Sequence, residues 1–198
     1  MKFSLIYLFS LAFLASNAQL DSKYDFNSPE YENQYLEHSP DCAFKLLKSN
    51  LPSVEMEPRT LFYYTHPKLK SILKDEQLME GQAHLYKVEE NIFLVLDFYI
   101  NSLNAKKSYG DLDAQSQIKI SFDNEEYIYL ENIERDRGRV DRRGGKTEYQ
   151  GVYPIPKSKL KQLRKHFIYK MGVMWEEGYE VYNVINIDLI KNQISCLE

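Results

Sequence analysis

Cysteine is scarce in this chain: Cys42 and Cys196 are the only two among its 198 residues. So few cysteines exclude a disulfide-rich scaffold, and two cysteines far apart, without a Cys-x-x-Cys pair, argue against a metal site built on thiolates. Glycine and proline, at 8 and 7 residues, are too few for a collagen-like or low-complexity chain. The formal net charge of −4 also argues against nucleic-acid binding.

Long apolar runs are missing except at the N-terminus. The stretch 3–15 is apolar, follows a single lysine and leads into the small-residue pattern Ser16-Asn17-Ala18. Because the run is too short to span a bilayer as a helix, residues 1–18 are predicted to be a signal peptide cleaved after Ala18. An uncleaved anchor is the alternative. The mature chain is expected to be secreted or periplasmic, without a membrane span, and its composition is typical of a bacterial exported protein.

The remainder divides into an arm and one domain. Residues 19–41 hold six acidic residues, one lysine and four aromatic residues without periodicity, which predicts an extended or poorly ordered acidic arm. Residues 42–198 are long enough for a single β-rich domain with its own core. In an exported protein, Cys42 and Cys196 are expected to form a disulfide across this domain, with two buried thiols as the alternative.

Strand patterns dominate the domain. Gln82–Val88 and Ile92–Ile100 are predicted to form a hairpin, and the nearly all-apolar second run is typical of a central strand. Ile168–Trp175 and Tyr179–Ile185 are predicted to form another hairpin around a glycine-containing turn. Gln117–Phe122 alternates apolar and polar residues, as a strand with one buried face does. Further strands are expected over 61–64, 126–130 and 147–155.

Short helices are expected at four places. The spacing of apolar residues predicts helices over 42–50 and 68–80. A third follows Pro156, with Leu160, Leu163 and Phe167 on one face, and a last one begins at the capping residue Asn186. The predicted class is therefore α+β: a predominantly antiparallel β-sheet, as a sandwich or strongly curled sheet, with two to four short helices.

The sequence contains fragments of cofactor- and metal-binding motifs, but each lacks required residues. Gly144-Gly145-Lys146-Thr147 resembles the end of a phosphate-binding loop, but Val140 stands where its first glycine is required and a strand follows. Asp111–Gln115 begins like a calcium loop, but Ser116 and Phe122 occupy the positions that need glycine and an acid. The four histidines show no zinc-binding spacing. No cofactor or metal is predicted, and no catalytic residue is assigned.

Asp97 is unusual because it interrupts an apolar run. A buried carboxylate costs several kcal/mol unless it is paired, and such groups collect at functional sites. Its neighbours on the same face should be Val95 and Tyr99. One interpretation is a small secreted hydrolase that acts on glycans or other envelope polymers, with Asp97 or a turn glutamate as the acid. The simpler one is a partly solvated face, or a pair with a lysine or arginine on a neighbouring strand.

The positive charge is concentrated in residues 135–170, which hold twelve Lys or Arg against three acidic residues, a net charge of +9. Cleavage after Ala18 removes one lysine and leaves a net charge of −5, so the rest of the mature chain carries −14. Arginine guanidinium groups bind carboxylate, sulfate and phosphate. One glycine-containing loop collects six of these cations and is the predicted anion- or partner-binding site: Arg135, Arg137, Arg139, Arg142, Arg143 and Lys146. The alternatives are that this loop pairs with the protein's own acidic surface or is only solvated.

Tyrosine is abundant, with 16 copies. Exposed tyrosine or tryptophan side chains would serve glycan stacking or protein contact, whereas strand tyrosines are more often packed. Seven tyrosines lie on expected strands: Tyr127, Tyr129, Tyr149, Tyr153, Tyr169, Tyr179 and Tyr182.

The leading hypothesis is an exported, non-enzymatic binding module for an anionic polymer or an acidic protein, acting through the arginine-rich loop and neighbouring tyrosines. The small hydrolase is the alternative, and a purely structural envelope component is a third possibility.

Overall fold

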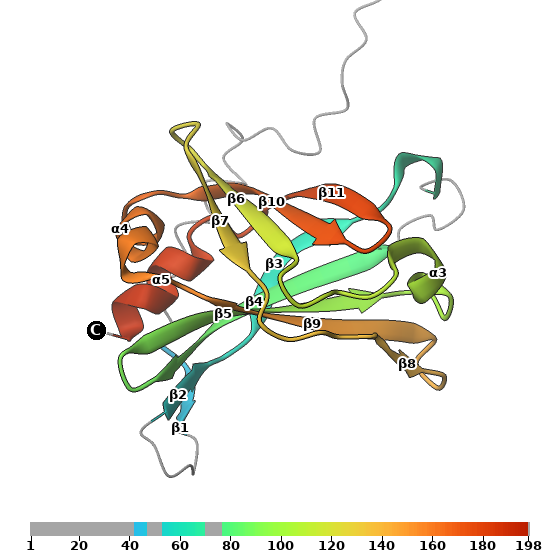
Figure 1. The fold of residues 1–198 in the computed structure, drawn as a ribbon, viewed down its shortest axis with the longest axis horizontal. Helices are drawn as coiled ribbons and strands as arrows, with labels where there is room; N and C mark the ends of the chain where they lie inside the picture. Colours follow the sequence, from blue (N-terminus) through green and yellow to red (C-terminus); the bar gives the residue numbers. More distant parts are fainter. Residues whose placement is uncertain (1–41, 47–52, 70–76, 198) are drawn as a thin grey trace, which may run out of the picture. The chain divides into compact units, whose positions relative to one another are not determined.

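The computed structural model describes residues 42–46, 53–69 and 77–197. The expected signal peptide (1–18) and acidic arm (19–41) lie outside the described residues. Two antiparallel sheets and three short α-helices make up most of the described part (Figure 1). This confirms the predicted dominance of antiparallel sheet with a few short helices. Among the described residues, no helix is long and apolar enough to cross a membrane.

The larger sheet has seven strands, and the predicted hairpin lies at its centre. β4 (Met79–Val88) pairs with β5 (Asn91–Ile100) along its whole length, with Gln82 opposite Asp97. Glu89 makes the tight turn with a φ of 53°. The remaining strands follow the order β1-β2-β4-β5-β9-β8, with β3 beside β4: β1 (Phe44–Leu46), β2 (Ser53–Met56), β3 (Arg59–Tyr64), β8 (Arg139–Asp141) and β9 (Lys146–Pro154).

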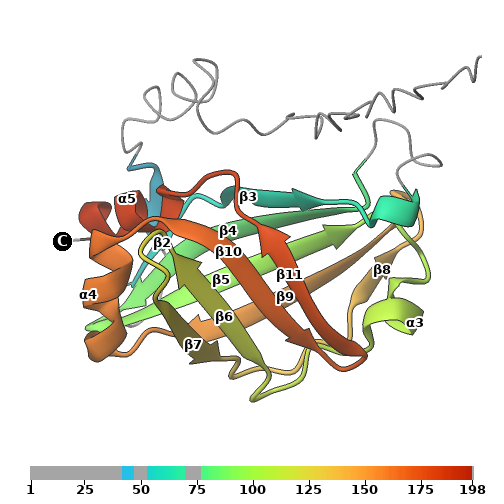
Figure 2. The same cartoon turned by 90° about the horizontal axis from the view of Figure 1, so that it is seen from above.

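The smaller sheet has four strands in the order β11-β10-β6-β7 (Figure 2). Its members are β6 (Gln117–Phe122), β7 (Tyr127–Glu131), β10 (Ile168–Trp175) and β11 (Gly178–Asn183). The predicted alternation in β6 is confirmed, because Ile118 and Ile120 are fully buried while Gln117 is exposed. The second hairpin is confirmed as well: β10 pairs with β11. Gly178 begins β11 with a φ of 147°, a conformation that suits glycine.

The core lies between the two sheets and is rich in aromatic rings. Phe62 of β3 stacks on Tyr182 of β11, with ring centroids 4.5 Å apart. Phe98 of β5 meets Trp175 of β10 edge to face at 4.9 Å. Such pairs contribute roughly 0.5–1.5 kcal/mol each beyond the area they bury.

Two backbone hydrogen bonds connect the sheets at their edges. The Ile185 amide, just after β11, donates to the Leu61 carbonyl of β3 at 2.9 Å. The Ile133 amide, just after β7, donates to the Val152 carbonyl of β9, also at 2.9 Å. The smaller sheet is thus joined to the larger one beside both of its edge strands, β11 and β7, and buried residues alternate with more exposed, outward ones along β6 and β7.

The helices close the ends of the sheets. α4 (Lys157–Lys165) and α5 (Leu189–Cys196) pack together at one end, and α3 (Ala105–Tyr109) lies at the other (Figures 1 and 2). α4 buries Leu163, and α5 buries Ile190 and Ile194, as predicted from their spacing. The residue that precedes α5 is Asp188, not the expected cap Asn186, because the chain makes one further turn before the helix begins.

Two helix predictions were wrong in their described parts. Within 42–50, Phe44–Leu46 forms strand β1, because it pairs with β2. Within 68–80, Pro67–Leu69 forms a 3₁₀ turn (η1) and Met79 already begins β4. Residues 70–76 of that prediction lie outside the described part. In both cases pairing with a neighbouring strand outweighed the local periodicity.

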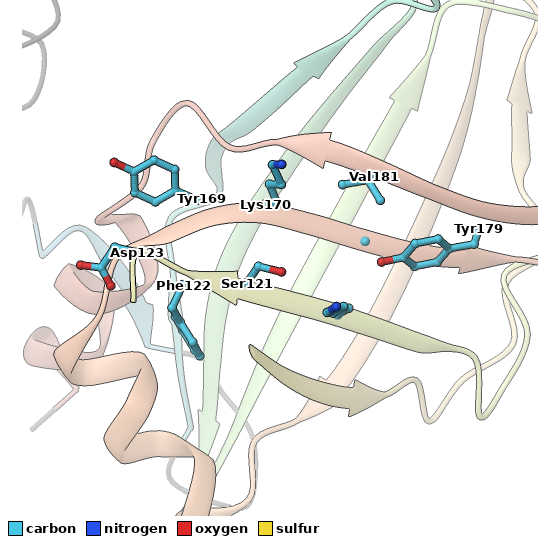
Figure 3. Close-up of a pocket in the computed structure, with 9 residues that line it drawn as sticks. Ser121, Phe122, Asp123, Tyr169, Lys170, Tyr179 and Val181 are labelled. Carbon is cyan, nitrogen blue, oxygen red and sulfur yellow. The ribbon is translucent and has the colours of Figure 1, made fainter. Parts of the chain in front are cut away.

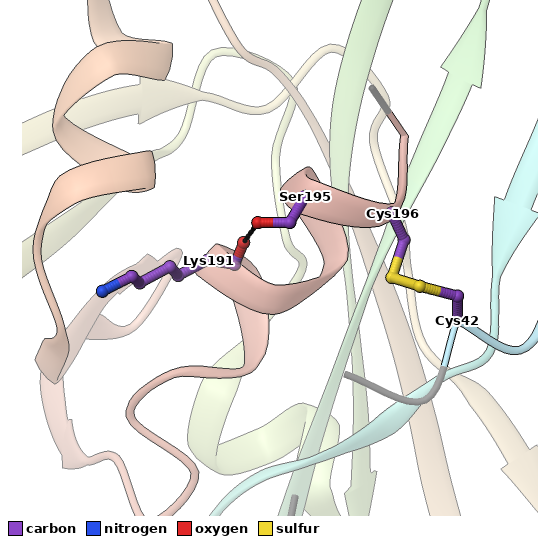
Figure 4. The surroundings of a disulfide bond; sticks show 4 residues. All are labelled: Cys42, Lys191, Ser195 and Cys196. Carbon is purple, nitrogen blue, oxygen red and sulfur yellow. Dashed lines mark hydrogen bonds between the residues drawn. A yellow bond between two sulfur atoms is a disulfide. The ribbon is translucent and has the colours of Figure 1, made fainter. Parts of the chain in front are cut away.

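The predicted disulfide is present (Figure 4). Cys42 and Cys196 are bonded, with their Cα atoms 5.5 Å apart and a sequence separation of 154. The bond ties the segment before β1 to the end of α5. By the chain-entropy relation, a loop of this length contributes about 5 kcal/mol at most.

Candidate functional site

The outward face of the smaller sheet carries an unusual density of exposed rings. Of the ten large hydrophobic residues exposed in the described part of the chain, six lie on this face: Tyr127, Tyr129, Tyr169, Met174, Tyr179 and Val181. Together with Lys119, Ser121, Lys170 and Gly172, they form what we call the Tyr–Lys face. Because single exposed apolar residues are ordinary and contiguous patches are not, this face is the strongest candidate for a binding surface.

A groove of about 550 Å³ crosses this face over β6, β10 and β11 (Figure 3). Its floor is Gly172, which lies opposite Lys119 of β6 and opposite Val181 of β11. The Tyr179 ring leans over this glycine, so that its hydroxyl oxygen would lie 2.0 Å from an added Cβ. Without a side chain at position 172, the ring and the groove can share the space above β10.

The groove runs from this floor towards the end of α4. Tyr169 and Lys170 flank it on β10, Ser121 lies opposite Lys170 on β6, and Asp123 lies at its far end (Figure 3). Phe122 also lines the groove while remaining almost fully buried. The lining therefore mixes aromatic rings, hydroxyl groups, two ammonium groups and one carboxylate.

The cations of the Tyr–Lys face are available, whereas its nearby acids are engaged. Neither Lys119 nor Lys170 forms an ion pair with a described residue; the Lys119 ammonium lies over the Tyr127 ring, 4.1 Å from its centroid. Glu131 accepts a hydrogen bond from the Gln117 amide at 3.2 Å. Asp123 lies 3.1 Å from Nδ1 of His166. The surface thus presents positive charge to a ligand.

On the outward face of the larger sheet, Asp97 is paired with a histidine. Its Oδ2 lies 3.6 Å from Nδ1 of His84, and its Oδ1 accepts a hydrogen bond from Gln150 at 2.8 Å. Nε2 of His84 lies 3.3 Å from Glu55, so the nearly buried imidazole lies between two carboxylates. The expected neighbours Val95 and Tyr99 share this face by strand alternation. Asp97 therefore has neighbouring-strand partners, as the simpler interpretation held, but they are His84 and Gln150 and not a lysine or arginine.

The structure divides the arginine-rich loop into paired and unpaired cations. Arg135 donates to the buried Asp111 carboxylate at 2.7 Å and lies 3.0 Å from Asp113. Lys106 of α3 reaches the other Asp111 oxygen at 2.9 Å. The hydrogen bond from Lys106, together with that from Arg135, lowers the pKa of Asp111. Arg135 thus fixes the chain after β7 to the start of the 111–116 segment.

The other members of the loop lie on or near the β8–β9 hairpin. Arg139 pairs with Glu148 on the facing strand. Lys146 lies 6.0 Å from the centre of the Tyr99 ring. Arg137, Arg142 and Arg143 are exposed and form no ion pair within the described residues. The loop therefore remains a predicted anion site whose available charge is smaller than the sequence suggested.

Neither the calcium interpretation nor a histidine-based metal site gains support. Asp111 is occupied by Arg135 and Lys106. Within the part that the structure describes, no group of three or more histidine, cysteine, aspartate or glutamate side chains is arranged to hold a metal ion.

The tyrosine pattern separates into two sets that the sequence did not distinguish. Burial raises the pKa of Tyr149, to about 12, and that of Tyr153 and Tyr182 as well, and all three lie in the core. The other four are on the Tyr–Lys face. Alternation between buried Ile128 and Leu130 and the intervening Tyr127 and Tyr129 was the available signal for this division.

No protein-family model, curated protein or solved structure matches this chain.

Proposed function

We propose that this protein is an exported, non-enzymatic module that binds an extended glycan on its Tyr–Lys face. The observation that carries the proposal is the concentration of exposed rings on one sheet face around a groove whose floor is a glycine. Aromatic rings offer flat surfaces for the C–H face of a sugar, and tyrosine adds a hydroxyl that can reach the sugar's own hydroxyls.

The position of the lysines favours a glycan over a protein as the occupant. Protein–protein interfaces are depleted of lysine at their centres. Here Lys119 and Lys170 stand on β6 and β10, the two central strands of the sheet. The tyrosines flank them on both sides, with Tyr127 and Tyr129 on β7 and Tyr179 on β11. This spread over four strands suits a chain of several sugars better than a single small molecule.

The arrangement of titratable groups favours binding over catalysis. Among the described residues that line the groove, Asp123 is the one with a carboxylate, and it is paired with His166. Glycoside hydrolysis ordinarily needs a pair of carboxyl groups across the scissile bond. Asp97, the acid of the hydrolase interpretation, lies on the larger sheet and lines no part of this groove.

Export is supported by two features. The Cys42–Cys196 bond is of the kind that persists in oxidising compartments. The apolar segment 3–15 with its small-residue cleavage pattern has the composition expected of a secretion signal. Arg137, Arg142 and Arg143, which form no ion pair with any residue that the structure describes, keep the arginine-rich loop as a second proposed surface, for an anionic polymer or an acidic protein.

Isothermal titration of the purified protein with a panel of neutral and acidic oligosaccharides tests the proposal. We expect at least one oligosaccharide to bind, and the Tyr179→Ala or Tyr127→Ala variant to bind about tenfold or more weakly. Tyr63→Ala is the matched control, because Tyr63 is equally exposed but lies on β3. Failure of every glycan to bind, or an equal loss in the control, would contradict the proposal.

A further inference from the structure

We infer that the glycan is a polyuronate, a chain of sugars that each carry one carboxylate and keep their free hydroxyl groups. This inference rests on the proposed glycan-binding function and names the ligand class of the same face. It depends on where the charges lie relative to the groove floor.

The two lysines lie beside the floor on adjacent strands. Lys119 is directly opposite Gly172 on β6, and Lys170 precedes Gly172 by two residues, so both project from the same face. A sugar that rests above Gly172 therefore has two ammonium groups within side-chain reach. Lysine is a compact point charge that can follow a carboxylate at varied angles.

The far end of the groove carries the opposite charge. Asp123 holds His166, and Ser121, opposite Lys170, offers a hydroxyl on the same side. A carboxylate at this end disfavours a second negative group on a ligand in the groove, and the Ser121 hydroxyl can hydrogen-bond to a sugar hydroxyl. Cations beside the floor and an acid at the end thus favour one charge per sugar, which disfavours a heavily sulfated chain.

Tyr179 supplies the surface on which the sugar would rest. Its ring lies over the glycine floor, and Val181 extends the apolar strip along β11. On the other side, the Lys119 ammonium already lies on the Tyr127 ring, which shows that this lysine can reach across towards β7. The next carboxylate of the chain can therefore meet Lys119 while its sugar lies on Tyr129, which is opposite Lys119 on β7.

Matched ligand pairs test the inference directly. Oligogalacturonate, oligoglucuronate and alginate oligomers are each compared with their own methyl esters, which keep the backbone and remove the charge. We expect at least one acid form to bind about tenfold or more tightly than its ester, with the difference shrinking at high salt. Lys119→Gln and Lys170→Gln should remove the difference. Lys107→Gln, an exposed lysine on α3, is the control that should keep it.

The outcomes separate the inference from the function on which it rests. Equal binding of acid and ester, or tighter binding of a sulfated glycan than of every uronate, overturns the inference and leaves glycan binding standing. Binding of neutral glycans alone would likewise overturn the polyuronate inference and leave glycan binding standing. If no glycan binds at all, both proposals fail together.

Discussion

The Tyr179 ring occupies the space that a side chain at position 172 would need. Its hydroxyl oxygen would lie 2.0 Å from a Cβ on Gly172, closer than any real contact. The two residues lie on paired strands, β11 and β10, of the same sheet. The glycine thus determines where the exposed ring lies, and with it the shape of the groove.

Gly172→Ala should displace the Tyr179 ring from the groove without unfolding the protein. The new methyl group meets the far end of an exposed, rotatable side chain, so the ring can swing away. We expect the free energy of unfolding to change by less than about 1 kcal/mol. Glycan affinity should fall about tenfold or more, because Tyr179 leaves its place. Urea denaturation and isothermal titration measure the two effects; unchanged affinity would contradict this role of Gly172.

Gly151→Ala provides the contrast. Its Cβ would lie 2.6 Å from the Tyr153 ring, which is fully buried and cannot move into solvent. This variant should lose roughly 1–3 kcal/mol of stability through overpacking. Equal stability of the two alanine variants would show that the surroundings of the glycines do not differ as described.

Asp111 should make the fold sensitive to acid. Hydrogen bonds from Lys106 and Arg135 lower its pKa in the folded state. A lowered carboxyl pKa contributes stability above the unfolded-state pKa, and this is lost as the pH falls through the folded-state pKa. Asp111→Asn should therefore be less stable than the wild type near neutral pH, and the gap should narrow on acidification. Urea denaturation from neutral to acidic pH measures the difference in the free energy of unfolding between the wild type and the variant. A difference that does not change with pH would contradict this role of Asp111.

Replacement of both cysteines should weaken the fold substantially. The bond closes a loop of 154 residues, so Cys42→Ser/Cys196→Ser should lose up to about 5 kcal/mol. Denaturant unfolding of the wild type, with and without reductant, provides the comparison. A loss below about 1 kcal/mol would show that the bond constrains little in the unfolded chain.

The arginine-rich loop should separate into structural and dispensable positions. Arg135→Gln removes a partner of the buried Asp111, so it should be clearly destabilising. The triple variant Arg137→Gln/Arg142→Gln/Arg143→Gln changes only exposed cations without an ion pair in the described part of the chain, and it should stay within roughly 0.5 kcal/mol of the wild type. Thermal unfolding of both variants is the measurement. The triple variant also tests the loop as an anion site, since it should weaken salt-sensitive binding of anionic ligands there.

Local signals in the sequence predicted the hairpins well. β4–β5 and β10–β11 each combine a short turn with two extended runs, and these features act between near neighbours in the chain. The helix prediction for 42–50 was wrong because the spacing of apolar residues there fits a helix, whereas pairing with β2 makes Phe44–Leu46 a strand. α3, a single short helix fixed by tertiary contacts, gave no periodic signal.

Only part of the candidate site could be predicted from the sequence. Alternation shows that Tyr127 and Tyr129 share one face of β7, but not whether that face meets the core. The pairing of Arg135 with Asp111 joins residues 24 apart and follows no local rule. Gly172 gives no sequence signal of its own, because its role depends on the position of the Tyr179 ring, which belongs to the neighbouring strand.

Amide chemical-shift mapping during titrations with the galacturonate, glucuronate and alginate oligomers tests the central claim most directly, because it locates the bound ligand on the protein. The account predicts that the largest shifts cluster on β6, β10 and β11, around Lys119, Gly172 and Tyr179. It would be contradicted by shifts confined to the β8–β9 hairpin, by shifts confined to β4 and β5 around His84 and Asp97, or by no shifts at any residue.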